Sequence, residues 1–122
     1  FRQLEIDYHY NSKQKRSKGW YLFVTSNIKK RTGLWTYWYE NGQVNRTGNY
    51  KIRQYDLGTT KQFYDSDRNG MWVFYHKNGK KEYQGKYLND RKYGCWITYK
   101  KDGSVWFKTN YNKIGKRTKQ GC

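Results

Sequence analysis

The sequence predicts an all-β protein that forms one domain of β-hairpin repeats. Aromatic residues make up 20% of the 122 residues, with 14 Tyr and 6 Trp, whereas all hydrophobic residues together reach only 34%. Burial must therefore come mainly from rings. The chain has 12 glycines and no proline, which together with the many aromatic residues favours extended strands joined by glycine turns. The length suits one independently folding domain.

The strongest signal is an internal repeat with three copies, at residues 33–50, 70–87 and 94–111. Each copy contains a Gly-x-Trp start, an aromatic residue, an Asn-Gly or Asp-Gly pair and a final tyrosine. In the first copy these residues are Gly33, Trp35, Trp38, Asn41, Gly42, Gly48 and Tyr50. The third copy has Thr109 where the first two have Gly48 and Gly85.

An Asn-Gly pair between alternating segments is typical of a two-residue type I′ turn, so each copy is expected to form one hairpin. In that register Trp35 faces Gly48, and Gly33 faces Tyr50. The same register pairs Trp72 with Gly85, Gly70 with Tyr87, Trp96 with Thr109 and Gly94 with Tyr111. Each large ring is thereby expected to cover a small residue on the partner strand.

Alternation along the strands assigns two faces, and the one that carries Trp35, Trp72 and Trp96, here called the Trp face, is expected to be the more buried. The return strands are expected to place Val44, Lys81 and Val105 on this face. The opposite face is expected to carry an exposed aromatic stripe for partner binding, formed by Trp38, Tyr75, Tyr99 and Trp106. Alternatively, this column packs against the ends of the array or a neighbouring chain.

Three segments lie outside the clear copies. Residues 1–32 are interpreted as an N-terminal strand followed by a degenerate capping repeat, in which Gly19-Trp20 is a decayed Gly-x-Trp start. Residues 51–69 look like an inserted half-repeat, because Phe63 precedes Gly70 as Tyr87 precedes Gly94. Residues 112–122 form a basic tail.

The repeated Gly-x-Trp strand, the Asn-Gly turn and the Gly-x-Tyr return strand resemble the membrane occupation and recognition nexus (MORN) repeat family. They are most similar to its variant of about 24 residues per repeat, which occurs in exported bacterial repeat proteins and antitoxin components. The resemblance covers residues 33–111. It implies an elongated antiparallel sheet of stacked hairpins that serves as a scaffold or binding surface, and it transfers no catalytic residues. Thr109 and the residues between the first two copies depart from the pattern.

The formal charge of +17 favours an anionic partner, such as an acidic protein, nucleic acid or an anionic lipid surface. The basic residues expected to bind a polyanion are Lys13, Lys15, Arg16, Lys18, Lys29, Lys30, Arg31, Lys113, Lys116, Arg117 and Lys119. They are expected mainly in linkers, turns and the tail. No apolar run is long enough to span a bilayer. A start at Phe1 without an initiator Met slightly favours a processed, exported chain.

The remaining reactive side chains predict no catalytic or metal site. Cys95 and Cys122 could form a single bridge, but the preferred interpretation makes Cys95 a small buried strand residue and Cys122 an exposed thiol. The segment from Asp65 to Gly70 opens like a calcium loop, yet His76 stands where the final acidic ligand is needed. His9 and His76 lack nucleophile or zinc spacing. No enzyme activity and no cofactor are expected.

The sequence therefore predicts a non-enzymatic protein interaction or scaffold module that belongs to a larger assembly. Aromatic anchors within a polar rim are the interface chemistry expected for this function. The alternative is a polyanion-binding protein that acts through its basic segments.

Overall fold

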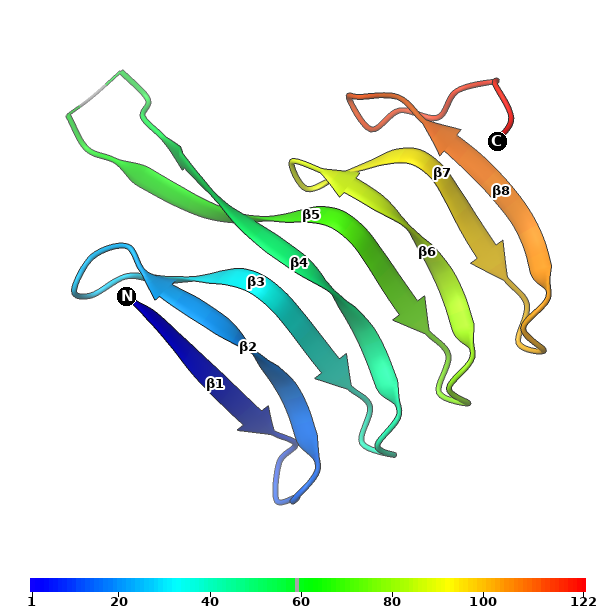
Figure 1. Ribbon diagram of the computed structural model, residues 1–122, viewed down its shortest axis with the longest axis horizontal. Coiled ribbons are helices and arrows are strands. Elements are labelled where there is room, and N and C mark those ends of the chain that lie inside the picture. Colours follow the sequence, from blue (N-terminus) through cyan, green and yellow to red (C-terminus); the bar gives the residue numbers. More distant parts are fainter. Residues whose placement is uncertain (59) are drawn as a thin grey trace.

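The computed structural model, which describes residues 1–58 and 60–122, is one open antiparallel sheet whose eight strands follow chain order (Figure 1). The strands are β1 (Arg2–Tyr8), β2 (Lys15–Phe23), β3 (Lys29–Trp38), β4 (Val44–Tyr55), β5 (Phe63–Tyr75), β6 (Lys81–Leu88), β7 (Arg91–Tyr99) and β8 (Val105–Tyr111). These residues include no helix. The all-β prediction and the stacked hairpins are confirmed.

The predicted pairings within the three repeat hairpins are also confirmed. Trp35 pairs with Gly48 and Gly33 with Tyr50 between β3 and β4. The corresponding residues of β5–β6 and β7–β8 pair in the same way. An additional hairpin, β1–β2, precedes these three and pairs with β3 through β2.

The type I′ turn, however, is wrong. The Tyr39 backbone N–H donates to the carbonyl of Gln43 at 2.9 Å, and the Gly42 N–H donates to the carbonyl of Tyr39 at 3.1 Å. Three residues therefore form the loop, and among them only Gly42 has a positive φ, at 89°. The side chain of Asn41 accepts a hydrogen bond from the Gln43 N–H at 2.9 Å. This is the three-residue hairpin loop that ends in a left-handed glycine.

A β-bulge after each of these loops restores the predicted register and changes the faces. Because Asn45 is the extra residue, Val44 pairs with Trp38 and belongs to the opposite face. Lys81 and Val105 do the same, pairing with Tyr75 and Tyr99. Their assignment to the Trp face was therefore wrong. A bulge places two residues of one strand opposite one residue of its partner. Counting alternate residues from the return strand toward the loop therefore assigns the wrong face beyond the bulge.

Each indole of the Trp face covers a glycine of the preceding hairpin, rather than the one within its own hairpin. A Cβ atom would lie 2.1 Å from the Trp35 ring at Gly19, and 2.2 Å from the Trp72 ring at Gly48. The third indole lies in the same way over Gly85. The close approach joins consecutive hairpins. Among the described strands, no tryptophan-bearing strand lies beyond β8, so no indole approaches Thr109 as it does the glycines.

Hydrogen bonds fix the three indoles in these positions. The Nε1–H groups of Trp35, Trp72 and Trp96 donate to the backbone carbonyls of Trp20, Asn49 and Lys86, at 3.0, 2.9 and 2.9 Å. Each acceptor is the residue directly after the covered glycine. One contact therefore satisfies the polar group of a buried indole and sets the spacing between hairpins.

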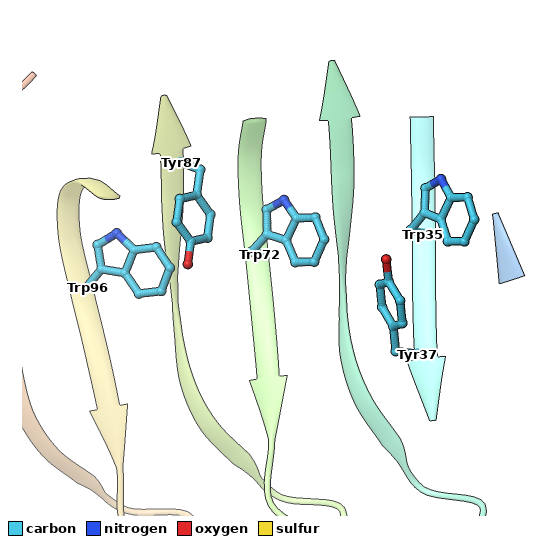
Figure 2. Close-up of a cluster of buried hydrophobic side chains, with 5 residues drawn as sticks. All are labelled: Trp35, Tyr37, Trp72, Tyr87 and Trp96. Atoms are coloured by element: carbon cyan, nitrogen blue, oxygen red, sulfur yellow. The ribbon is translucent and has the colours of Figure 1, made fainter. Parts of the chain in front are cut away.

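The aromatic core is a single row of rings on the Trp face. Figure 2 shows its most buried members, Trp35, Tyr37, Trp72, Tyr87 and Trp96. Trp72 at its centre is 0% exposed. A tyrosine of the preceding strand meets each indole edge-on, with centroid distances of 5.0 Å for Tyr21–Trp35, 5.1 Å for Tyr50–Trp72 and 4.9 Å for Tyr87–Trp96.

The first hairpin, β1–β2, packs against the next hairpin in the same way as the later ones do. The predicted role of Gly19-Trp20 is therefore corrected. Gly19 lies under an indole and Tyr21 meets that indole edge-on, as Gly48 and Tyr50 do one hairpin later. Gly19-Trp20-Tyr21 is therefore the Gly-x-Tyr motif of a return strand and not a decayed Gly-x-Trp start. The misreading arose because Trp20 stands at the variable position of that motif.

Residues 51–69 are not an inserted half-repeat. The described residues 51–55 and 63–69 belong to β4 and β5, which pair from Lys51 with Asp67 to Tyr55 with Phe63. Arg53 donates from Nε to Asp67 at 2.8 Å and from a terminal nitrogen to Asp65 at 3.1 Å. The additional residues extend one inter-hairpin connection, and the sheet keeps its strand order.

The C-terminal segment folds back onto the sheet. The preferred prediction, a buried Cys95 and a free thiol at Cys122, was wrong. Cys95 and Cys122 form a disulfide. The position of Cys95 in β7 corresponds to Leu34 and Met71, whose side chains are 56% and 46% exposed, so this column is accessible to the tail rather than buried. Thr118 N–H donates to the carbonyl of Asn110 at 2.8 Å, which places the tail along the edge of β8.

We expect Gly48→Ala to lower the free energy of unfolding by about 2 kcal/mol, because the added methyl group overlaps the Trp72 ring and must displace it. Urea denaturation monitored by tryptophan fluorescence measures the change. Gly121→Ala is the control, since a Cβ at Gly121 meets open space. Equal stability of the two variants would contradict the close indole–glycine contact.

Candidate functional site

Hydrogen bonds connect successive hairpin loops along one edge of the sheet. The Asn41 amide donates to the carbonyl of Lys77 at 2.8 Å, and the Asn78 amide donates to that of Lys101 at 3.0 Å. The Tyr39 hydroxyl donates to the carbonyl of Tyr75 at 2.7 Å. In the first hairpin, His9 Nε2 donates to the carbonyl of Trp38 at 2.9 Å. The repeat asparagines thus align neighbouring hairpins as well as shaping their own turns.

The candidate site is a row of cations on the Trp face. Each cation is the backbone pairing partner of the tyrosine of a return strand, on the segment directly beside that strand. The pairs are Tyr21–Arg31, Tyr50–Arg68, Tyr87–Lys92 and, through the folded tail, Tyr111–Arg117. Neighbouring cations are two strands apart, or roughly 10 Å. The repeat therefore encodes a regular cationic row beside the aromatic core.

The cations lie over the rings of the core. Arg31 Cζ is 5.2 Å from the centroid of Trp35, and Lys92 Nζ is 4.8 Å from that of Trp96. Arg46, outside the row, is closer, with Cζ 3.8 Å from the centroid of Tyr37. Such cation–π contacts hold the charges at fixed places above an apolar surface.

Most of these charges form no ion pair with the acidic residues that the structure describes. Arg68 forms an ion pair with Asp90 at 2.6 Å. Within residues 1–58 and 60–122, no ion pair involves Arg31, Arg46 or Lys92. Burial raises the pKa of Tyr37 well above its ordinary value, and its 3.1 Å hydrogen bond with Tyr50 adds to this effect. Tyr37 therefore stays neutral and does not compensate the charge of Arg46 above it.

Two hollows border the row. The larger one, of about 620 Å³, lies beside β1 to β4 and includes Trp35, Arg31 and Arg46 together with the acidic residues Glu5 and Asp7. The smaller one, of about 180 Å³, lies beside β6 to β8. The acids of the larger hollow are neutralised by Lys29 and Arg16, with Lys29 Nζ 2.7 Å from Glu5 Oε2.

The predicted aromatic stripe is not one exposed surface. Trp38, Tyr75 and Tyr99 lie at equivalent ends of β3, β5 and β7 on the opposite face, and all three are half-buried. Trp106 is separate from them. It is the extra residue of the β8 bulge, it is 64% exposed, and its ring centroid is 5.5 Å from that of Phe107.

The predicted polyanion-binding residues are also divided. Lys13, Lys113 and Lys116 lie in loops, and Arg117 and Lys119 lie in the tail. The others, Lys15, Arg16, Lys18, Lys29, Lys30 and Arg31, lie in β2 and β3 and not in linkers. Arg16 and Lys29 are occupied by acidic partners.

The predicted polyanion-binding residues did not include Arg46, Arg68 or Lys92. A signal for two of them was present, because Arg31, Arg68 and Lys92 each stand two residues before a repeat-starting glycine. Arg46 carried no such signal, since its place beside Tyr37 depends on the bulge.

Neither a metal site nor a membrane-spanning helix is found in the described part of the chain. No group of three or more His, Cys, Asp or Glu residues there could hold a metal ion. No helix of those residues is long and apolar enough to cross a membrane.

Comparison with known proteins identifies the repeats. The family model described as the MORN repeat variant matches residues 31–51 and 68–89. These segments contain the first two copies of the repeat, and each begins close to the cation that precedes the starting glycine. No curated protein and no solved structure matches the chain significantly.

Proposed function

Because the chain is a MORN-repeat protein, and such repeats are generally non-catalytic protein-binding or membrane-binding modules, we propose that it is a non-enzymatic interaction module. Its Trp face holds an acidic segment of a protein partner, within a larger assembly. The observation that carries this proposal is the set of fixed cations over buried rings, Arg31, Arg46 and Lys92, without acidic partners in the described chain.

The geometry suits an extended acidic segment. The described residues form a single-layered sheet, and none of its strands covers the Trp face. Carboxylates spaced along a peptide would meet cations that recur at roughly 10 Å intervals. Rings beneath the cations supply apolar contact, and aromatic and arginine side chains commonly dominate binding energy at interfaces. Trp38, Tyr75 and Tyr99 remain proposed as additional anchors on the opposite face.

A binding experiment with short poly-L-glutamate tests the proposal. We expect R31Q/R46Q to weaken binding about tenfold, because charge-assisted hydrogen bonds from fixed guanidinium groups are lost. The control K113Q/K116Q removes the same charge from the loop after β8 and should weaken binding less than about threefold. Isothermal titration calorimetry measures both.

Equal weakening by the two double variants would contradict this proposal and favour the alternative, a polyanion-binding protein that acts through general charge. The net charge of +17 favours that alternative. Its own signature is affinity for nonspecific nucleic acid or anionic vesicles that falls steeply between about 50 and 200 mM salt.

The disulfide supports a further part of the proposal, that the protein works in an oxidising compartment. Bonds such as Cys95–Cys122 form and persist mainly in exported proteins. Mass determination of the protein isolated under thiol-blocking conditions tests this, and a free thiol at both positions would contradict it.

A further inference from the structure

The last hairpin of the sheet carries a hollow at the position that an indole occupies between consecutive hairpins. Between consecutive hairpins, the space beside the return-strand tyrosine is filled by the next indole, as Trp72 fills it beside Tyr50. Tyr111 is the fourth tyrosine of this series, and residues 112–122 after it contain no tryptophan. The resulting hollow of about 180 Å³ is lined by Tyr83, Lys92, Trp96, Thr98, Phe107, Thr109, Tyr111 and Arg117.

Another indole cannot fill this hollow in the manner of the internal hairpins. Such an indole lies so close to the covered glycine that a Cβ there would be 2.1 to 2.3 Å from the ring. The equivalent position is Thr109, which has a Cβ. The folded tail also lies along β8, where a following strand would pair. The hollow is therefore open to a ligand other than another repeat.

Two cations face this hollow. Lys92 Nζ is surrounded by rings, at 4.8 Å from the centroid of Trp96, 5.5 Å from Tyr111 and 5.6 Å from Tyr83. Arg117 reaches the hollow because the tail bridges back to Tyr111, in the way that Arg31, Arg68 and Lys92 pair with their tyrosines. The tail thus supplies the cation of a next repeat without its tryptophan.

The hollow contains donors and no acid. Thr98 and Thr109 add hydroxyl groups to Lys92 and Arg117, and none of the described residues that line the hollow is Asp or Glu. Among the residues that the structure describes, neither cation takes part in an ion pair. By contrast, Glu5 and Asp7 line the larger hollow beside β1 to β4, where they pair with Lys29 and Arg16.

We propose that this hollow is an oxyanion-binding site, in which Lys92 and Arg117 pair with one carboxylate, phosphate or sulfate group and the Thr98 and Thr109 hydroxyls donate hydrogen bonds to it. Ammonium, guanidinium and hydroxyl donors converging on a small space with apolar walls are suited to such a group. The inference rests on the proposed function for the source of the anion, which would be one acidic group of the bound partner.

The experiment is an NMR titration of the ¹⁵N-labelled protein with sodium acetate, phosphate or sulfate, at ionic strength held constant with chloride. We expect saturable shifts of the Thr109 and Arg117 amides and of the Trp96 indole N–H with at least one of these anions. Acetate binding would indicate a carboxylate source, and binding of phosphate or sulfate alone would indicate an esterified one.

R117Q is expected to weaken this binding about tenfold, through loss of a charge-assisted pair. K119Q is the matched control, because it removes the same charge from the same tail without touching the hollow, and its effect should stay below about twofold. K92Q provides a second test on the other side of the hollow, with folding confirmed by unchanged circular dichroism.

Absence of saturable shifts, or equal weakening by R117Q and K119Q, would overturn the site. The outcome is separable from that of the proposed function. Anion binding without poly-L-glutamate binding would leave the site and remove the function. Poly-L-glutamate binding that R117Q does not weaken, together with no binding of small anions, would leave the proposed function and remove the oxyanion site.

Discussion

Trp72→Ala is expected to lower the free energy of unfolding by about 4 kcal/mol, within the range for removal of a fully buried large ring. Trp72 is 0% exposed and meets rings of both neighbouring strands, with Tyr50 at 5.1 Å and Tyr87 at 6.3 Å. The substitution also leaves the carbonyl of Asn49 without its indole donor. In a single-layer sheet, no second layer can collapse into the cavity.

Urea denaturation monitored by circular dichroism measures this loss. Trp106→Ala is the matched control, because it removes the same side chain from a bulge where it is 64% exposed, and it should cost less than about 1 kcal/mol. Comparable losses for the two variants would mean that the row of rings on the Trp face is not the core.

Removal of the disulfide in C95S/C122S is expected to lower the free energy of unfolding by about 3.5 kcal/mol, the loop-closure value for a sequence separation of 27 residues. The unfolded chain gains freedom, and the tail loses its covalent anchor beside β8. We also expect faster proteolytic cleavage of the tail after Arg117, because only the bridge between Tyr111 and Arg117 and nearby backbone hydrogen bonds then hold it.

Thermal and urea denaturation of the oxidised protein and of C95S/C122S give the difference. A reducing agent should destabilise the oxidised protein by the same amount and leave the double variant unchanged. If the oxidised protein and the double variant were equally stable and equally resistant to proteases, the tail would not depend on the disulfide.

The strand pairing could be predicted from the sequence because a two-residue side-chain period and a repeated motif determine it together. Trp35 and Gly48 recur at a fixed separation, so one register satisfied every copy. The pairing was nevertheless predicted correctly only because two errors cancelled, one in the loop length and one in the missing bulge. The loop is one residue longer than a type I′ turn, and the bulge at Asn45 absorbs the difference, so pairing was correct while Val44 was placed on the wrong face.

Contacts between hairpins could not be predicted from the sequence pattern. Trp35 has a glycine on each neighbouring strand, Gly19 and Gly48, and nothing in the spacing determines toward which one the indole leans. The cationic row depended on the same packing, since Arg31 and Arg68 acquire their tyrosine partners only when successive hairpins pair. The disulfide similarly required knowledge that the Cys95 column is exposed and that the tail returns to it.

The central claim, that the Trp face is the binding surface, is tested most directly by the indole N–H signals of the ¹⁵N-labelled protein during titration with poly-L-glutamate. Trp35, Trp72 and Trp96 belong to the Trp face, and Trp20 lies on the opposite face. We predict that the signals of Trp35 and Trp96, which lie beneath Arg31 and Lys92, shift and saturate while that of Trp20 remains in place. A saturable shift of Trp20 without shifts of Trp35 and Trp96 would contradict the claim.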